Sequence, residues 1–386
     1  MPKDPINILI ISHSGDSGGA ESSLLDLLRN INRDKFNPIV IIPHPGPMAD
    51  KLKEINILFY CRFIDHWIPL AKAFGVKHSV NFLKSLRGRI WSISHLIENH
   101  NIDIIYTNTI LPLDGALAAK KHGIPHIWHI REYPIGNKDI KRYFPWPHII
   151  VNYLSSHIIT NSKNLKLKIK SKLISRPISV IYNGVTKNDN NQPFFEKQIP
   201  LDKKIITTVC AITPRKDLKT FLLAAKILTT IRKDISFLIV GTGEPSYIQE
   251  LKFLIESYNI APFINFMGQR KDAIDIMKKS NVVTLTSTQE AFGRVIIEAM
   301  SVGTPVISTS SGGPSEIIEN EVDGFLIPIG DAKALASIIN KILDNPEISK
   351  KISDNGIKKS SKIFNIENYV KSIESIITTT YSSSKN

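Results

Sequence analysis

Cysteine, long apolar runs and targeting signals are scarce in this chain of 386 residues, and each absence excludes a class of protein. The two cysteines, Cys61 and Cys210, lie far apart in the sequence and predict neither a disulfide framework nor a metal site. No apolar run reaches 18 residues, and the apolar run near the N-terminus is too short for a signal peptide. We therefore expect a cytoplasmic protein, with peripheral binding at the inner face of the cell membrane as an open alternative.

The signatures of several enzyme classes are missing as well. The chain contains no D-x-D pair, no His/Cys cluster with metal-ligand spacing and no P-loop, and we interpret G-D-S-G-G at 15–19 as a strand-to-helix turn and not as the G-x-S-x-G of a hydrolase. A metal-clamped diphosphate, a hydrolase and a kinase are therefore not predicted. We expect neither a metal nor a cofactor, and any phosphate of a substrate would have to be neutralised by cationic side chains and helix N-termini.

The charge balance, in contrast, is strongly positive at +14, with 49 Lys and Arg against 35 Asp and Glu. Such an excess favours an anionic membrane, nucleic acid or a phosphorylated substrate as partner. No nucleic-acid-binding motif is recognisable, so nucleic acid is not expected. The cations gather in two clusters of six in the first half, Arg62, Lys72, Lys77, Lys84, Arg87 and Arg89, and Lys163, Lys166, Lys168, Lys170, Lys172 and Arg176.

Apolar side chains accompany both basic clusters. Mixed aromatic and cationic residues, or an apolar stripe beside lysines, are typical of a segment that lies on an anionic membrane surface. Ordinary basic helices over a core are the alternative interpretation. The side chains concerned are Trp67, Phe74, Phe82 and Trp91 in the first cluster, and Leu165, Ile169 and Leu173 in the second.

The length predicts two domains, and the hydrophobic pattern gives both the same α/β character. In the first half, short apolar runs predict strands at 6–12, 38–43, 104–107, 126–129 and 158–160, with helices at 20–30 and 113–121. The second half predicts strands at 205–210, 237–240, 282–285 and 306–308, and helices at 218–231, 246–258, 273–279, 292–301 and 332–343. Two doubly wound parallel sheets facing a central cleft follow, as residues 1–186 and 204–363. The polar stretch 187–203 is the expected linker, and the Ser/Thr-rich tail from Thr378 is expected to fray.

Two carboxylates, Glu290 and Glu298, stand on either side of a glycine in the segment after the predicted strand 282–285. The two glutamates are eight positions apart. At a helical rise of about 1.5 Å per residue, their separation suits the two ends of a nucleotide sugar. The diphosphate would lie over the helix start near Gly293, where N–H groups and the helix dipole favour anions. This segment is the candidate donor site.

Other loops at the carboxyl ends of predicted strands add weaker candidates. Gly18 and Gly19 form a strand-to-helix turn whose N–H groups would approach a phosphate, although a plain tight turn explains them equally. Arg215 and Lys216 sit at a helix start, where cations oppose the dipole unless an anion compensates them; a solvated charge pair is the alternative.

Three further positions are ambiguous from the residues alone. Gly241 and Gly243 form a lone G-x-G that also fits an ordinary turn, and Arg270 would offer at best a contact to a base. His129 ends a strand of the first domain and would face the cleft, but a single histidine is more often structural than catalytic.

An ordered series of short motifs resembles the retaining glycosyltransferases of family 4, the group 1 enzymes of the GT-B fold. The series covers nearly the whole chain. It consists of G-G-A-E at 18–21, N-G-V at 183–185, the two glutamates of E-x7-E at 290 and 298, G-T-P-V at 303–306, G-G-P-S-E at 312–316 and D-G-F-L at 323–326.

The resemblance implies two Rossmann-like domains, with the acceptor bound by the first and the nucleotide sugar by the second. It also implies a last helix, residues 364–380, that crosses back to the first domain. By the same resemblance, Glu290 contacts the sugar hydroxyls, Glu298 the ribose and Lys216 the diphosphate. The amides of Phe292, Gly293, Arg294 and Val295 would meet sugar and phosphate, and His129 would lie beside the reacting sugar.

The expected activity is therefore transfer of a sugar from a nucleotide-diphosphate donor to a hydroxyl of a glycan or lipid-linked acceptor, with retention of configuration and without metal. We expect a UDP-linked donor in preference to a GDP-linked one, and a bacterial cell-envelope polysaccharide as product. One departure from the family pattern is Cys210-Ala211, where a G-R pair is usual. Arg215 either replaces the missing arginine or diphosphate binding is weakened. The alternatives are a non-catalytic GT-B subunit that binds sugar nucleotides for a partner transferase, and a sugar-nucleotide epimerase.

Overall fold

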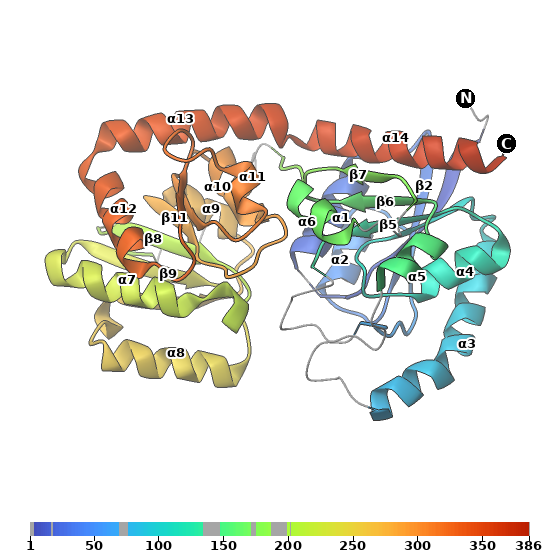
Figure 1. Ribbon diagram of the computed structural model, residues 1–386, viewed down its shortest axis with the longest axis horizontal. Helices are drawn as coiled ribbons and strands as arrows, with labels where there is room; N and C mark the ends of the chain where they lie inside the picture. The colour runs from blue at the N-terminus through green and yellow to red at the C-terminus, as the bar shows by residue number, and fades with distance from the viewer. Residues whose placement is uncertain are drawn as a thin grey trace. The chain divides into compact units, whose positions relative to one another are not determined.

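The chain forms two compact units, each built on its own parallel sheet (Figure 1). A computed structural model describes residues 4–16, 18–68, 76–133, 147–170, 175–186, 199–200 and 202–385. Unit 1 comprises Met1–Gly184 together with Ile366–Asn386, and unit 2 comprises Val185–Asn365. Most of the predicted linker, residues 187–198 and 201, lies outside the described residues.

Unit 1 carries a seven-stranded sheet in the order β3-β2-β1-β4-β5-β6-β7, and every described strand pair in it is parallel. Its strands are β1 (Ile6–Ile11), β2 (Phe36–Ile42), β3 (Phe59–Cys61), β4 (Ile104–Thr107), β5 (His126–Ile130), β6 (His157–Thr160) and β7 (Ile178–Val180). Its helices are α1 (Gly19–Asn30), α2 (Pro47–Glu54), α3 (Val76–Asn99), α4 (Asp114–His122), α5 (Pro147–Leu154), α6 (Lys163–Ile169) and α14 (Ile366–Lys385).

Alternation along β1 explains why helices cover both faces of this sheet. Successive side chains of a strand point to opposite faces. Ile8 and Ile10 pack with α1, α2 and α14 on one face, whereas Leu9 and Ile11 pack with α3 and α4 on the other. A strand that is apolar on both faces therefore specifies a buried parallel sheet.

Unit 2 repeats this design with six parallel strands in the order β10-β9-β8-β11-β12-β13. The strands are β8 (Lys204–Val209), β9 (Ile235–Val240), β10 (Ile264–Gly268), β11 (Val282–Leu285), β12 (Val306–Thr309) and β13 (Phe325–Ile327). The helices are α7 (Leu218–Ile231), α8 (Pro245–Ser257), α9 (Ala273–Lys279), α10 (Arg294–Ser301), α11 (Pro314–Ile317), α12 (Ala332–Asp344) and α13 (Pro346–Ile363). The predicted doubly wound α/β class is thereby confirmed for both units.

The last helix, α14, belongs to unit 1 although it follows all of unit 2 in the chain (Figure 1). Its buried residues recur every three or four positions, which places them on one helical face against the core of unit 1. They are Ile366, Tyr369, Val370, Ile373 and Ile377. The expected fraying from Thr378 is wrong, because Thr380 is buried and Tyr381 packs against the same core, so the helix continues to Lys385.

Candidate active site

The strand order of unit 2 defines where a ligand site is expected. The chain runs from β8 to β9 and β10 on one side and then returns to β11 on the other, so β8 and β11 are neighbours from which the connections diverge. In open α/β sheets, ligands bind beyond the carboxyl ends of the strands at such a switch point. The loop after β8 contains Arg215 and Lys216, and the loop after β11 contains Glu290.

Backbone contacts hold these two loops together. The amide of Thr288 donates to the carbonyl of Arg215 over 2.9 Å, and the Thr286 hydroxyl donates to the carbonyl of Lys216 over 2.9 Å. Pro214 opens a short 3-10 turn, and Asp217 in a left-handed conformation ends it while its side chain caps α7. The cations therefore sit on a turn whose backbone is fixed from both sides.

Glu290 and Lys216 form the central contact of this site. Lys216 Nζ donates to Glu290 Oε2 over 2.5 Å, and the Ser287 hydroxyl donates to the same oxygen over 3.1 Å. Arg215 Nη1 lies 3.7 Å from that oxygen. Burial raises the pKa of Glu290, but Lys216 and Arg215 outweigh burial and hold it below its usual value. Glu290 is consequently an ionised carboxylate between two cations.

A second turn supports the Glu290 loop from the far side. The amide of Gly313 donates to the carbonyl of Glu290 over 2.8 Å, and the amide of Glu290 donates to the carbonyl of Ser311 over 2.9 Å. A Cβ on Gly313 would lie 2.4 Å from the Cα of Phe292. Only glycine permits this approach, which gives the G-G-P sequence a physical reason.

Gly293 determines where the following helix begins. Its φ of +96° is left-handed, and α10 starts one residue later at Arg294. The predicted start at residue 292 is therefore wrong, because Phe292 is buried before the helix and packs edge-on against Phe364 at 6.0 Å between ring centroids. As in any helix, the N–H groups of the first turn, here those of Arg294 and Val295, have no acceptor within the helix.

Glu298 lies on the second turn of α10, where Arg294 Nε donates to its Oε1 over 2.5 Å. The spacing of four residues places both side chains on one face of the helix. A ligand that reaches Glu298 therefore meets a carboxylate already engaged by a neighbouring guanidinium.

Close packing accounts for two other predicted donor residues, Gly241 and Gly243, and an ion pair accounts for a third, Arg270. A Cβ on Gly241 would lie 1.9 Å from the carbonyl oxygen of Cys210, and one on Gly243 would lie 1.9 Å from that of Ile212. The G-x-G segment thus lies directly against the backbone that follows β8. Arg270 donates to both carboxylate oxygens of Asp272, over 2.7 Å each. Donor contacts of these three residues stay a prediction.

In unit 1, the structure places His129 away from the surface. Its side chain is fully buried, Tyr106 OH contacts its Nδ1, and Arg131 Nη2 lies 3.2 Å from the same nitrogen. Burial, aided by the charge of Arg131, holds the pKa of His129 well below its usual value. The catalytic role that the resemblance implies for His129 stays a prediction.

Arg131 connects His129 to distant parts of unit 1. Its guanidinium donates to Asn108 Oδ1 over 2.8 Å, to Asn183 Oδ1 over 2.7 Å and to the hydroxyl of Tyr369 over 2.8 Å. Three polar partners satisfy this buried charge, as its burial requires. Arg131 was not among the predicted site residues, although a charged residue that directly follows a strand buried on both faces is a visible signal in the sequence.

The turn at Gly18 and Gly19 begins α1, with Gly18 as N-cap and no side-chain cap. Ser17 lies outside the described residues. Glu21, the last residue of the G-G-A-E motif, has its Oε1 2.9 Å from Nδ1 of His13. His13, Glu21 and the nearby Glu132 are site candidates that the residues alone did not bring together.

The basic clusters of unit 1 expose only some of the apolar residues expected. Trp67 and Phe82 are buried, as are Leu165 and Ile169, so these four side chains face the core and not a membrane. Phe74 and Leu173 lie outside the described residues. On α3, the expected Trp91 is exposed (62%), together with two apolar side chains that were not predicted, Val80 (42%) and Leu83 (62%).

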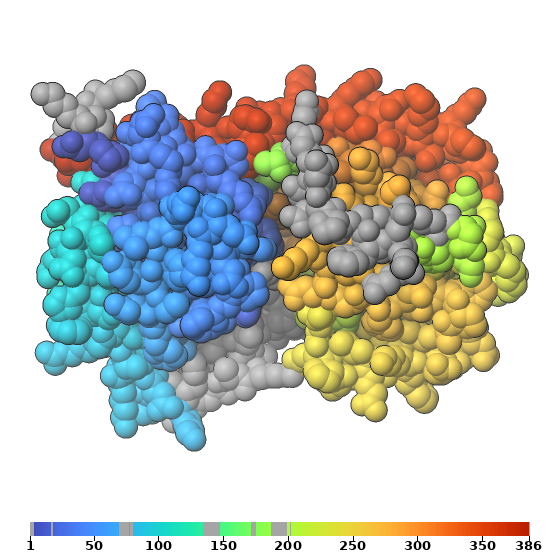
Figure 2. All heavy atoms as spheres, turned by 180° about the vertical axis from the view of Figure 1, so that it is seen from behind, coloured from blue at the N-terminus to red at the C-terminus, as the bar shows by residue number. Residues whose placement is uncertain are grey.

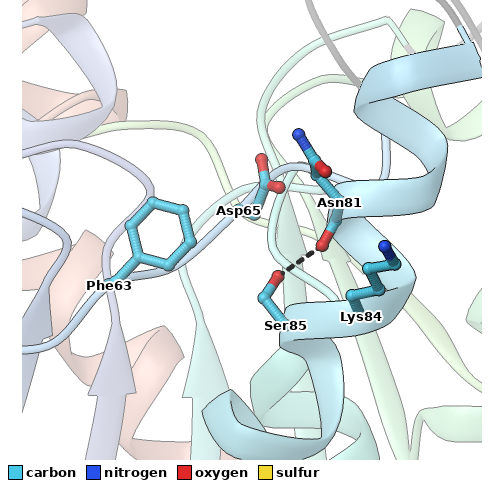
Figure 3. A pocket seen from close by; sticks show the side chains of 5 residues that line it. All are labelled: Phe63, Asp65, Asn81, Lys84 and Ser85. Carbon is cyan, nitrogen blue, oxygen red and sulfur yellow. Dashed lines mark hydrogen bonds between the residues drawn. The ribbon is translucent and has the colours of Figure 1, made fainter.

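An open cavity of about 410 Å³ lies beside α3 (Figure 3). Phe63 and Asp65 of the segment after β3 face Asn81, Lys84 and Ser85 of the helix across it. Among the described residues, no three His, Cys, Asp or Glu side chains are placed to hold a metal ion. None of the described helices is both long and apolar enough to cross a membrane.

Comparison with known proteins decides the family. A model described as Glycosyltransferase Family 4 matches residues 17–188, and one described as Glycosyl transferases group 1 matches residues 189–359. The chain belongs to the group 1 glycosyltransferases. The two family models together thus span both units of this glycosyltransferase.

Relatives of this glycosyltransferase match over most of its length. A UDP-Gal:alpha-D-GlcNAc-diphosphoundecaprenol alpha-1,3-galactosyltransferase of Escherichia coli is 25% identical over 92% of this chain and 95% of its own. An uncharacterized glycosyltransferase of Methanocaldococcus jannaschii is 29% identical over 86% of this chain and 92% of its own. A crystal structure of Anabaena HepE in complex with UDP-glucose has a TM-score of 0.80 at 24% identity, over 97% of this chain and 100% of its own. The fold of this glycosyltransferase is GT-B.

The position of Glu290 predicts a pH-dependent contribution to stability. Because its pKa is lower in the folded chain, its stabilisation is complete above the unfolded value near 4.5 and disappears as the pH falls through the folded value. We expect Glu290→Gln to lower the free energy of unfolding at pH 7, by about 1.4 kcal/mol for each pH unit by which the folded pKa lies below the unfolded one, and we expect this effect to shrink as the pH is lowered toward 3. Urea unfolding of the native protein and of Glu290→Gln, each between pH 7 and pH 3, measures the difference in stability. Glu256→Gln, at an exposed position of α8, is the control, and an equal effect of Glu290→Gln at both pH values would contradict the assignment.

Proposed function

We propose that this glycosyltransferase transfers a sugar from a nucleotide-diphosphate donor to a hydroxyl of a glycan or lipid-linked acceptor, with retention of anomeric configuration and without a metal. The observation that carries the proposal is the contact of Lys216 and Arg215 with Glu290 at the switch point of unit 2. Two cations on one fixed turn supply the charge that a departing diphosphate requires in the absence of a metal.

A nucleotide sugar is supported as donor by two kinds of observation. In unit 2, the cationic turn and the start of α10 follow neighbouring strands, and both favour phosphate. The crystal structure of HepE contains UDP-glucose, and the name of the Escherichia coli relative specifies UDP-Gal. A UDP-linked donor is therefore favoured over a GDP-linked one.

Glu290 would position the donor and not attack it. An ionised carboxylate paired with Lys216 accepts hydrogen bonds from sugar hydroxyls, which holds the sugar in place. The leaving phosphate would take the proton of the acceptor hydroxyl as the new bond forms on the same face of the sugar. Glu298 would hold the ribose, while the amides near Gly293 in unit 2 and the turn at Gly18 and Gly19 in unit 1 would contact sugar or phosphate.

Arg215 is positioned to compensate for the missing family arginine. Ala211 is exposed just after β8, and four residues later the guanidinium of Arg215 donates to the carbonyl of Gln289 over 2.9 Å. The same guanidinium is near Glu290, where Lys216 also points. This second cation beside Glu290 supports the proposal that Arg215 compensates for the arginine that the family has at position 211.

The acceptor is proposed to be a growing or lipid-linked bacterial envelope polysaccharide. Relatives include a capsular polysaccharide biosynthesis glycosyltransferase of Staphylococcus aureus and a lipopolysaccharide core biosynthesis mannosyltransferase of Rhizobium meliloti. The Escherichia coli relative is named for a diphosphoundecaprenol-linked sugar, a lipid-linked acceptor.

Helix α3 supplies a surface for peripheral binding to an anionic membrane. Lys77, Lys84 and Arg87 are exposed at a spacing that places them on the helical face of Val80, Leu83 and Trp91. Figure 2 shows this helix on the surface of unit 1, in light blue. Cations beside apolar side chains suit the headgroup region of an anionic bilayer.

The donor site is tested first by calorimetric titration of the purified protein with UDP, GDP, ADP and their common sugar conjugates. We expect tight binding of a uridine nucleotide, weakened about 10-fold or more in Glu298→Ala because a hydrogen-bonded carboxylate at the ribose is lost. If no nucleotide of the panel binds, the result would contradict the donor site and favour the alternative of a non-catalytic subunit with an altered nucleotide pocket.

Turnover distinguishes an enzyme from such a subunit. Glu290→Ala and Lys216→Ala are each expected to lower kcat by about 100-fold or more, because each removes a group that holds the donor or its departing charge. Circular dichroism should show an unchanged fold. Glu250→Ala, at an exposed ion pair on α8, is the matched control and should keep the native rate. A near-native rate for either site variant would refute its assignment.

Membrane binding is tested with liposomes of neutral and anionic lipid. Replacement of Lys77, Lys84 and Arg87 by Gln removes three cations at about 1 kcal/mol each, so partition onto anionic vesicles should fall roughly 100-fold. The control replaces Lys351, Lys358 and Lys371, exposed on α13 and α14, and should keep most of the binding. Co-sedimentation that does not depend on anionic lipid would remove the proposal.

A further inference from the structure

A titratable cluster lies at the carboxyl ends of two strands of unit 1 and the start of α1. The chain passes from β1 to β2 and β3 on one side and returns to β4 on the other, so the switch point of this sheet lies between β1 and β4. His13 follows β1 by two residues, and Glu132 follows β5 by two. Glu21 enters from the first turn of α1. The cluster therefore occupies the place where this sheet would bind a ligand.

Glu21 fixes the imidazole of His13. His13 Nδ1 and Glu21 Oε1 are 2.9 Å apart, with the Glu21 side chain 4% exposed and the His13 side chain 20% exposed. A Cβ on Gly18 would crowd the Glu21 carboxylate at 2.7 Å, so the glycine leaves room for it. A carboxylate at this distance from Nδ1 attracts a proton there, which favours the neutral tautomer that keeps a lone pair on Nε2.

The surroundings of His13 are rich in carboxylate and poor in cation. Glu132 is held by the amides of Ile110, over 2.7 Å, and Arg131, over 3.2 Å, and its charge acts on His13. The Arg131 guanidinium acts in the opposite sense, but it is directed to Asn108, Asn183 and Tyr369. His66 lies on the remaining side, with its ring 6.0 Å from that of His13. An anionic ligand would meet two carboxylates here, whereas a sugar hydroxyl can donate to either type of group.

We propose that His13, oriented by Glu21, accepts a hydrogen bond from a hydroxyl of an uncharged sugar acceptor in unit 1. The inference rests on the proposed function, because it assigns the acceptor side of that reaction. It differs from the role that the resemblance implies for His129, whose side chain is completely buried, whereas part of His13 is exposed.

The proposal fixes the direction of a pH dependence. Burial lowers the pKa of His13, but the carboxylates of Glu21 and Glu132 outweigh burial and Arg131, so the pKa lies above the usual 6.5. Below that pKa, Nε2 carries a proton and no longer accepts. Efficiency toward the acceptor, kcat/KM, should therefore fall as the pH falls through the pKa of His13.

The experiment uses the full chain with octyl glycosides as acceptors and a UDP-sugar as donor. His13→Ala should raise KM for the glycoside about 10- to 100-fold and leave UDP binding unchanged. His13→Gln, whose amide oxygen accepts at any pH, should restore acceptor binding and remove the decrease of kcat/KM at low pH, the acidic limb of the pH profile. Glu21→Gln should move that limb to lower pH, since the imidazolium loses its partner. His44→Gln, at a half-exposed histidine after β2, is the matched control.

Two readouts separate failure of this inference from failure of the proposed function. If the native chain transfers sugar and His13→Ala keeps its acceptor KM within about twofold, only the inference is overturned. If kcat/KM toward the acceptor instead falls as the pH rises, an anion is bound to the imidazolium, and the inference is also overturned. If no sugar is transferred, NMR of the labelled histidines still decides: the His13 resonance should shift on titration with octyl glycoside, and an unmoved resonance refutes the contact.

Discussion

The contact between Lys216 and Glu290 ties together the ends of two neighbouring strands, and much of unit 2 is arranged so that these side chains meet. Threonine side chains and amides of the β11 loop bind the carbonyls of the β8 turn, and Asp217 ends that turn. On the far side, the absence of a side chain at Gly313 lets a third loop support Glu290. Burial alone would favour a protonated carboxyl, so the cations decide its charge.

Both units use one topological rule for different chemistry. In each sheet the connections diverge between two adjacent strands, and charged residues gather where those strands end. Unit 2 places two cations around one carboxylate there, which suits a phosphate. Unit 1 places two carboxylates around one histidine, which suits hydroxyl groups. The fold thus provides the location, and the residues provide the selectivity.

Periodicity predicted most of the fold because apolar side chains carry that signal. Helices such as α7 and α9 were predicted at their observed limits, since their apolar stripes begin and end with the helix. Local chemistry that overrides the stripe was missed: the left-handed Gly293 delays α10, and burial of Thr380 prolongs α14 beyond an apparently frayed tail.

The candidate sites show the same difference between features that are visible in the sequence and features that depend on local structure. Glu290, Arg215 and Lys216 were predicted, because charges in strand-end loops are visible in the sequence. The pairing of His13 with Glu21 was not, because it depends on how a turn directs two side chains. Burial was equally hidden: Trp67 and Phe82 face the core while Trp91, of similar sequence character, is exposed.

The crossing of α14 has a consequence for how the protein comes to be made. Ribosomal synthesis delivers the seven strands of unit 1 first and its covering helix only after all of unit 2. Until then, the apolar face that receives Ile373 and Ile377 is uncovered, and the guanidinium of Arg131 lacks the hydroxyl of Tyr369. The N-terminal half of the nascent chain therefore cannot mature ahead of the C-terminal half, as domains made in sequence usually do. Completion of unit 1 therefore waits for the synthesis of unit 2, so a chain interrupted after unit 2 would present an open core to chaperones and proteases.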